Sequence, residues 1–349
     1  MRHRFLGSIG ALAVIAVVSL APVNAAGQAP KAAPAADNKT PQSRTPWGDP
    51  DLQGVYTFST LTPVERPREF AEKDTLTEAE LAALEKKNAI RIITDSELPA
   101  GETGAYNAFW TSNEKGRLTG HTSLIVDPEN GRQPPLTAAA QKAQENFLTE
   151  TASRIRGVKP YQHLLINKPA DFDEFTRCLA RPMPRIGQSY NHGIQVLQTP
   201  GYVVIDYESM HDVRIIPLDR RPHLDQQISL WNGDSRGHWE GQTLVVEVTN
   251  FTNKTLFADY RGFDGIFKNS GTRLTERFTR VDANTINYEV TVDDPATWTK
   301  PWTFILPWRS DDPNYKNPED LYEYACHEGN FRMVEDALLG SRVIEQTVK

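Results

Sequence analysis

The strongest constraint on the fold is a series of short β-strand patterns in the second half of the chain. Apolar and β-branched residues recur in segments such as 202–207, 243–249 and 285–292, and a Thr-Pro-Gly turn at 199–201 precedes the first of these. Further strand patterns lie at 122–127, 194–198, 213–216, 272–280, 304–306 and 322–326. Short strands joined by turns are typical of an antiparallel barrel or sandwich. We therefore expect a mainly β protein with its barrel at 189–349.

Helical patterns precede this region. Thr77 is followed by acidic and then basic residues over 77–87, which predicts a helix with an N-terminal cap. A second helix is expected from 136 to about 155, with Thr137 as its cap. Residues 46–188 are therefore expected to be a mixed region with a few short helices that packs on the barrel or covers its mouth.

The chain begins with a pattern typical of an export signal. Arg2 and Arg4 precede an apolar stretch, and Val23-Asn24-Ala25 matches a signal-peptidase site. We expect cleavage after residue 25, a periplasmic or secreted protein and no membrane span afterwards; a retained anchor helix is the alternative. Residues 26–45 are rich in Ala, Pro, Gln and Lys and are expected to form a flexible linker.

The net charge bears on which partners the chain can bind, and the cysteine count bears on whether it contains a disulfide. Removal of residues 1–25 changes the formal charge from −7 to −9, because two arginines and no acid are lost. An acidic chain argues against non-specific nucleic-acid binding. Cys178 and Cys326 are the two cysteines, and an even number in an exported protein favours one disulfide, with two separate thiols as the alternative.

Four stretches resemble a known group of proteins. They are 50–56 (PDLQGVY), 201–204 (GYVV), 233–241 (GDSRGHWEG) with the following TLVV, and 324–330 (YACHEGN). Together they resemble a large family of exported bacterial proteins of unknown function, over essentially the whole chain after the signal. The resemblance implies no particular activity. Residues 52–56 (LQGVY) and the hairpin 274–292 also resemble parts of lipocalin-like barrels. This resemblance implies a barrel of that type.

Glu276 is the leading candidate for chemistry. In the strand pattern Leu-Thr-Glu-Arg-Phe, it shares a face with Leu274 and Phe278 and should point inward. A buried carboxyl group either finds a partner or acquires a raised pKa, and the second case suits a general acid or base. An internal salt bridge or a position at the mouth of the barrel is the alternative interpretation.

Two histidines could work with this carboxyl group. His211 shares a face with Val213 and Ile215, so this face is expected to point inward, although a lone inward His is more often structural. His327, in Cys326-His-Glu328, would lie beside the disulfide. As a zinc motif this triplet is weak, because zinc sites need three or four convergent ligands, and we expect no metal and no cofactor.

Substrate binding is expected from aromatic and charged residues near the barrel. Aromatic walls with a few polar groups describe a small-molecule pocket, although they equally describe a core. Arg214 and Arg236 could receive an anionic group, although arginines that brace turns are commoner. The candidates are Arg214, Arg236, Trp239, Tyr288, Trp298, Trp302 and Glu328.

The stretch 233–237 (GDSRG) matches the Gly-x-Ser-x-Gly pattern of serine hydrolases. Such a motif needs a helix directly after the serine, whereas a strand pattern follows here at 243–249. We therefore interpret 233–241 as a loop in which Asp234 braces the turn, with Arg236 and Trp239 at a pocket rim. Ser235 is not expected to be a nucleophile.

The function hypothesis that follows is an enzyme using acid–base chemistry of lyase or isomerase type. Its substrate would be a small hydrophobic or aromatic molecule in the barrel, with Glu276, His211 and His327 as catalytic groups. A non-catalytic, lipocalin-like binding protein and a hydrolase are the alternatives. The sequence leaves the oligomeric state open.

Overall fold

The structure is a computed structural model that describes only part of the chain. The described residues are 43–95, 117–153, 174–175, 177–186, 191–257, 266, 268–312, 321–328, 331, 334–335 and 338–339. All of them belong to one compact unit, Lys39–Lys349. The expected signal peptide at 1–25 and most of the expected linker at 26–45 lie outside the described residues.

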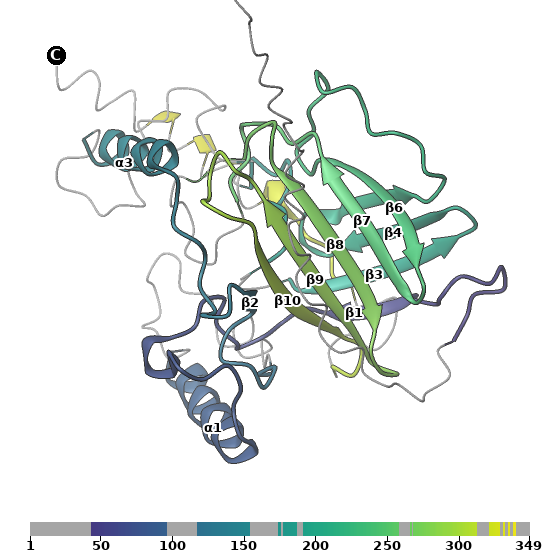
Figure 1. Ribbon diagram of the computed structural model, residues 1–349, viewed down its shortest axis with the longest axis horizontal. Coiled ribbons are helices and arrows are strands. Elements are labelled where there is room, and N and C mark those ends of the chain that lie inside the picture. Colours follow the sequence, from purple (N-terminus) through teal and green to yellow (C-terminus); the bar gives the residue numbers. More distant parts are fainter. Residues whose placement is uncertain are drawn as a thin grey trace, which may run out of the picture. The chain divides into compact units, whose positions relative to one another are not determined.

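An antiparallel sheet that curls into a nearly closed barrel dominates the described part of the chain (Figure 1). The described strands are β1 (Gly54–Thr57), β2 (Ile125–Asp127), β3 (Gly193–Thr199), β4 (Tyr202–Tyr207), β5 (Asp212–Pro217), β6 (Asp234–Glu240), β7 (Thr243–Thr249), β8 (Arg273–Arg280), β9 (Thr285–Asp293) and β10 (Trp302–Arg309). Nine of them follow the order β5-β4-β3-β1-β10-β9-β8-β7-β6, and β2 pairs with β10 outside this path. This arrangement confirms the expected mainly β, barrel-type fold.

Residue alternation explains why these segments form the barrel wall. In β9, Ile286, Tyr288, Val290 and Val292 are buried, and the residues between them are half-buried. β7 likewise places Leu244, Val246 and Val248 inward and exposes Glu247, as its sequence predicts. Because each strand buries one face, the inward side chains together form the core.

The edge strands β5 and β6 meet through side chains, although no backbone ladder joins them among the described strands. Arg214 of β5 donates a hydrogen bond from Nη2 to Oγ of Ser235 on β6, over 2.9 Å. A Cβ at Gly237 would lie 2.8 Å from Ile216 Cγ2 and from Leu218 Cδ2. The two edges are therefore close-packed, and glycine at 237 permits this approach.

Three sequence expectations about these strands were wrong. The stretch 234–240, expected to be a loop, is strand β6, because it pairs with β7 along its whole length. β5 faces the opposite way from the prediction: Val213 and Ile215 are 50% and 63% exposed, whereas Arg214 is buried. Residues 322–325 form no strand, and a helical turn begins at Cys326.

The N-terminal region contributes both strands and helices. β1 lies between β3 and β10, so the sheet includes residues from both sides of position 188. Helix α1 (Glu78–Asp95) begins where expected: Thr77 Oγ1 accepts the Glu80 amide hydrogen, and Glu80 Oε2 accepts that of Thr77. Helix α3 (Ala138–Ser153) has Thr137 as its cap. Two short 3₁₀ turns are η1 (Arg68–Phe70) and η3 (Ser209–His211).

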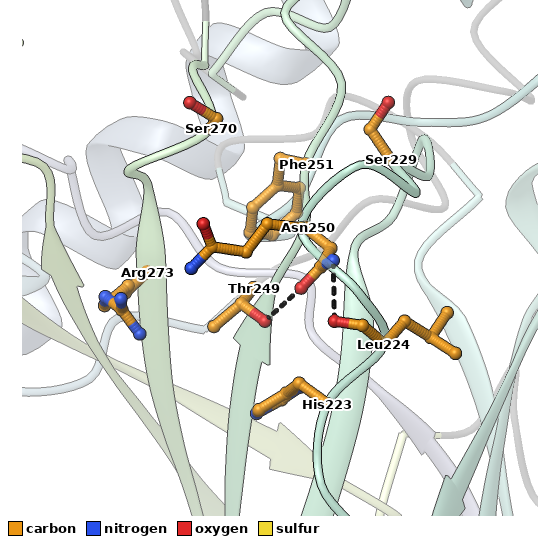
Figure 2. A pocket seen from close by; sticks show the side chains of 9 residues that line it. His223, Leu224, Ser229, Thr249, Asn250, Phe251, Ser270 and Arg273 are labelled. Atoms are coloured by element: carbon orange, nitrogen blue, oxygen red, sulfur yellow. Dashed lines mark hydrogen bonds between the residues drawn. The ribbon is translucent and has the colours of Figure 1, made fainter.

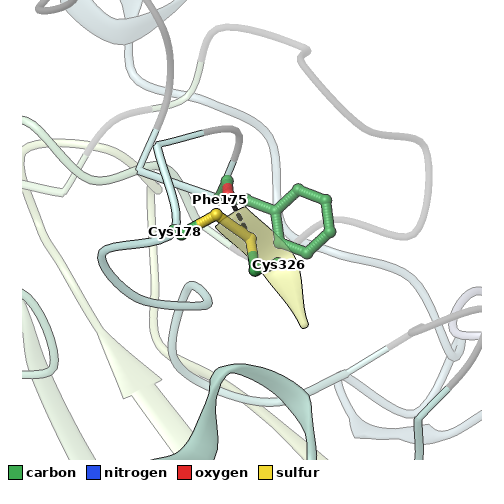
Figure 3. The surroundings of a disulfide bond; sticks show 3 residues. All are labelled: Phe175, Cys178 and Cys326. Carbon is green, nitrogen blue, oxygen red and sulfur yellow. Dashed lines mark hydrogen bonds between the residues drawn. A yellow bond between two sulfur atoms is a disulfide. The ribbon is translucent and has the colours of Figure 1, made fainter. Parts of the chain in front are cut away.

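The expected disulfide between Cys178 and Cys326 is present (Figure 3). Its two Cα atoms are 5.9 Å apart, and the residues are separated by 148 positions in sequence. Cys326 Sγ also lies 3.9 Å from the carbonyl oxygen of Phe175. The bond therefore ties the segment before β3 to the residues that follow β10.

Candidate functional site

Glu276 points into the barrel, as expected, but its carboxylate is fully engaged. Arg214 approaches it from β5 with two hydrogen bonds, of 3.0 Å from Nη1 to Oε1 and 2.5 Å from Nη2 to Oε2. The Tyr288 hydroxyl donates to Oε1 over 2.5 Å. Glu276 is 0% exposed and Arg214 is 4% exposed. The group is therefore a buried ion pair, the alternative that the sequence left open.

The protonation states of this network follow from burial and charge. Burial alone would lower the pKa of Arg214, but the adjacent Glu276 carboxylate raises it above its usual value. Burial and the same carboxylate raise the pKa of Tyr288 well above the ordinary tyrosine value. Arg214 therefore stays charged and Tyr288 stays a hydrogen-bond donor at any physiological pH.

The structure does not bring the two histidines to Glu276. His211 is exposed in the 3₁₀ turn η3 that precedes β5, and its Nε2 accepts the backbone N–H of Tyr324 over 3.0 Å. His327 and Glu328 are exposed in the helical turn that begins at the disulfide. The three expected catalytic groups thus occupy separate environments, one inside the barrel and two on the surface.

The aromatic residues expected to bind substrate form packed core instead. Tyr288 packs against Phe278 with ring centroids 4.9 Å apart, and Trp298 packs against Trp302 at 5.5 Å. Tyr288, Trp298 and Trp302 are all buried, whereas Trp239 is half-buried. None of these aromatic residues lines the cavity described next.

A surface cavity lies where β7 ends and β8 begins, below the loop that precedes β6 (Figure 2). Its volume is about 150 Å³. Figure 2 shows Arg273 on one side, Leu224 on the other and Asn250 between them. The lining residues are His223, Leu224, Gln226, Ser229, Thr249, Asn250, Phe251, Ser270 and Arg273. Polar side chains therefore predominate, with Phe251 as the aromatic wall.

Asn250 fixes the loop over this cavity. Its Nδ2 donates to the carbonyl oxygens of Asp225 and Ile228, both over 2.9 Å, and to that of Leu224 over 3.3 Å. Its Oδ1 accepts the hydroxyl of Thr249 over 2.7 Å. Asn250 has φ 60°, a left-handed conformation that asparagine tolerates better than most residues. One side chain thus holds three loop carbonyls and shapes the cavity wall.

Asp234 attaches the same loop to β6 and orients His223. Its Oδ2 lies 2.8 Å from His223 Nδ1 and accepts the Leu224 amide over 3.1 Å. Its Oδ1 pairs with Arg236 Nη1 at 2.7 Å, and Arg236 Nε donates to the Pro222 carbonyl over 3.1 Å. Asp234 thus braces a turn as expected, although the turn is the 222–224 loop and Arg236 is part of the brace.

The two basic residues of the cavity, His223 and Arg273, each have hydrogen-bonding groups that no described residue occupies. His223 Nε2 is buried and has no hydrogen-bond partner among the described residues; the nearest carboxylate oxygen, on exposed Glu247, is 3.9 Å away. Arg273 is exposed, and the described part of the chain offers it neither an ion pair nor a hydrogen bond. Arg273 and His223 therefore bring to the cavity lining an unpaired guanidinium and an imidazole whose Nε2 is buried without a hydrogen bond.

Comparisons with protein-family models, with curated proteins and with solved structures find no match to this chain. The resemblance to an exported bacterial family therefore stays a prediction. Within the described residues, no cluster of three or more His, Cys, Asp or Glu side chains could hold a metal ion. No helix there is long and apolar enough to cross a membrane.

Sequence reasoning missed His223 and Arg273. His223 lies in a stretch without strand or helix periodicity, so no pattern indicated which way its side chain points. Arg273 follows the alternation of β8, being exposed where Leu274 is buried, and resembles any outward arginine on a strand. The one available signal was Asp234 in the 233–237 motif, because a buried Asp near a turn needs donors.

Proposed function

We propose that the protein binds a small carboxylate or similar anion in the surface cavity between the 223–229 loop and the adjoining ends of β7 and β8. The observation that carries this proposal is Arg273, an unpaired guanidinium at a cavity whose other lining side chains include both hydroxyl and amide groups and the apolar Leu224 and Phe251. A guanidinium fork matches a carboxylate with two hydrogen bonds.

The cavity volume limits the size of the ligand. A cavity of about 150 Å³ is known to hold benzene, so the ligand should have roughly six to eight non-hydrogen atoms. Phe251 offers one apolar wall, and Ser229 and Ser270 offer hydroxyl groups at the rim. We therefore expect a short-chain carboxylate with one further polar group, and a weaker fit for larger ligands.

Catalysis at Glu276 on a hydrophobic substrate has less support. Both oxygens of that carboxylate are held by Arg214 and Tyr288, and no solvent reaches the side chain. A serine hydrolase reaction has less support too, because Ser235 lies on a strand and its hydroxyl accepts from Arg214. Ligand binding requires no change in either arrangement.

The location outside the cytoplasm is part of the proposal. The Cys178–Cys326 disulfide supports it, because such bonds persist mainly in oxidising compartments. Detection of a mature N-terminus near residue 26, in protein recovered from the periplasm or medium of an expressing bacterium, would test this point. Retention of residues 1–25 on the recovered protein would contradict it.

Calorimetric titration with acetate, pyruvate and benzoate tests the binding proposal. We expect the three-carbon acid to bind most tightly and Arg273→Met to weaken its binding by about tenfold or more. Arg277→Met is the matched control, because Arg277 lies on the same strand and pairs with Glu240 rather than with the cavity. Glu247→Gln should tighten binding by removing a nearby negative charge. Equal affinities for Arg273→Met and the wild type would contradict the proposal.

A further inference from the structure

The Asp234 carboxylate holds His223 in the way that a carboxylate usually holds a histidine that acts as a base. The Asp234 carboxylate pairs with Arg236 and can only accept hydrogen bonds, so the hydrogen of the neutral imidazole lies on Nδ1. The lone pair of Nε2 then carries no proton, and the nitrogen itself is buried. Nε2 has no hydrogen-bond partner among the described residues. A carboxylate that fixes the tautomer and aims the second nitrogen is the arrangement found in His-dependent catalysts.

We propose that His223 is a catalytic proton-transfer base that acts on a 2-oxo carboxylate held by Arg273. This inference rests on the proposed binding function and adds a reaction to it. His223 and Arg273 line the same cavity, and a short 2-oxo acid matches the volume argued above. The carboxylate on Arg273 would fix one end of the ligand and leave the carbon next to its carbonyl group for His223.

The reaction is an enolisation and balances without a cofactor. Nε2 takes a proton from the carbon adjacent to the ketone, and the electron pair of the broken C–H bond forms a C=C bond. The carbonyl π electrons move to oxygen, which becomes an enolate. The proton on Nε2 exchanges with solvent, and return of a proton from Nε2 to carbon then restores the ketone and the neutral imidazole. The Ser229 and Ser270 hydroxyls and the Arg273 guanidinium are the cavity's donors to an enolate oxygen.

Glu247 lies beside this buried nitrogen. Its carboxylate lies 3.9 Å from Nε2, too far for a hydrogen bond, and its side chain is 63% exposed. An exposed glutamate without a hydrogen bond among the described residues can rotate away at little cost. A ligand in the cavity would then reach Nε2, so Glu247 is a gating side chain rather than a partner in the reaction.

The loop that carries His223 should stay folded when the imidazole is removed. Without the imidazole, Asp234 still accepts the Leu224 amide and still pairs with Arg236, so the loop keeps two of its anchors. His223→Gln should therefore fold and keep the cavity. A matched control is His238→Gln on β6, because His238 lies 3.3 Å from Glu240 and does not line the cavity.

Exchange of the pyruvate methyl hydrogens in deuterated buffer, followed by proton NMR, tests the inference. We expect the wild type and His238→Gln to accelerate exchange over buffer. His223→Gln should still bind pyruvate through Arg273 in calorimetry, and it should lose the acceleration by about 100-fold or more.

The outcomes separate the two proposals. Binding of pyruvate by the wild type without faster exchange, or equal exchange by His223→Gln, would overturn the catalytic role alone. Absence of pyruvate binding, or unchanged binding in Arg273→Met, would overturn both proposals. If the His223 variant does not fold, pyruvate binding by the wild type without faster exchange still overturns the catalytic role.

Discussion

At the residue scale, Glu276 and Arg214 stabilise the barrel only as a pair. Each charge is buried, so removal of one partner leaves the other without compensation. Arg214→Met or Glu276→Gln should lower the free energy of unfolding by about 3–5 kcal/mol. Chemical denaturation measures this change. The exposed pair of Arg277 and Glu240 is the control, and its loss should cost less than about 1 kcal/mol.

The double variant Arg214→Met/Glu276→Gln makes this prediction sharper. It removes both charges together, so its loss of stability should be smaller than the sum of the two single losses by about 1–3 kcal/mol. Additive losses would show that the two residues act independently. Glu276 would then again be a candidate catalytic residue.

Lys268 is another buried ionisable residue. Its Nζ donates to the Leu256 carbonyl and lies 4.8 Å from the centroid of the Phe257 ring. Burial lowers the pKa of this amine to about 7, although the Glu174 carboxylate opposes the shift. The ordinary lysine pKa of about 10.4 applies to the unfolded chain. Folding therefore favours the neutral amine over a wide pH range.

This shift predicts how stability depends on pH. Between about pH 7 and 10.4, the unfolded chain holds a proton on Lys268 that the folded chain lacks, so the free energy of unfolding rises with pH. The slope from this group reaches about 1.4 kcal/mol per pH unit and vanishes below about pH 7. Urea denaturation at pH 7, 8 and 9 should show this rise in the wild type relative to Lys268→Met. Exposed Lys254→Met should parallel the wild type; a parallel Lys268→Met series would refute the assignment.

At the element scale, the seam between β5 and β6 depends on Gly237. A Cβ there would meet Ile216 Cγ2, which is fixed close to its backbone, and Leu218 Cδ2, which can move. Gly237→Ala should therefore lower the free energy of unfolding by about 1–3 kcal/mol. Thermal or chemical denaturation measures the loss. Gly237→Ala/Ile216→Ala should lose less than the two single variants combined, and a fully additive loss would contradict the contact.

The strands show which structural features a sequence can predict. β7 and β9 were predictable because apolar and polar residues alternate strictly, so one face must be buried. β6 was missed because Gly237, His238 and charged residues give it no such pattern, and pairing with β7 decides its conformation. The face of β5 was misassigned because a buried arginine looks exposed in sequence. Its carboxylate partner on β8 is 62 positions away.

At the scale of the whole molecule, sequence indicated the barrel but not the order of its strands. β1 lies between β3 and β10, far from both in the chain, and a local pattern carries no information on such neighbours. The candidate site is likewise formed by residues that are distant in sequence. Arg273 and His223 line one cavity only because the loop before β6, held by Asp234, lies against the adjoining ends of β7 and β8. Cys178 and Cys326 were the exception, since chemistry limits two cysteines to one mutual bond.

That disulfide should stabilise the fold as a whole. It closes a loop between residues 148 positions apart, and restriction of such a loop in the unfolded chain corresponds to about 4–5 kcal/mol in the entropic model. Cys178→Ser/Cys326→Ser should therefore unfold at lower denaturant, with a loss of about 2–5 kcal/mol. Dithiothreitol should lower the stability of the wild type to that of the variant and leave the variant unchanged. If reduction leaves the wild-type transition in place, local contacts rather than the covalent bond hold the segment at Cys178 against the residues that follow β10.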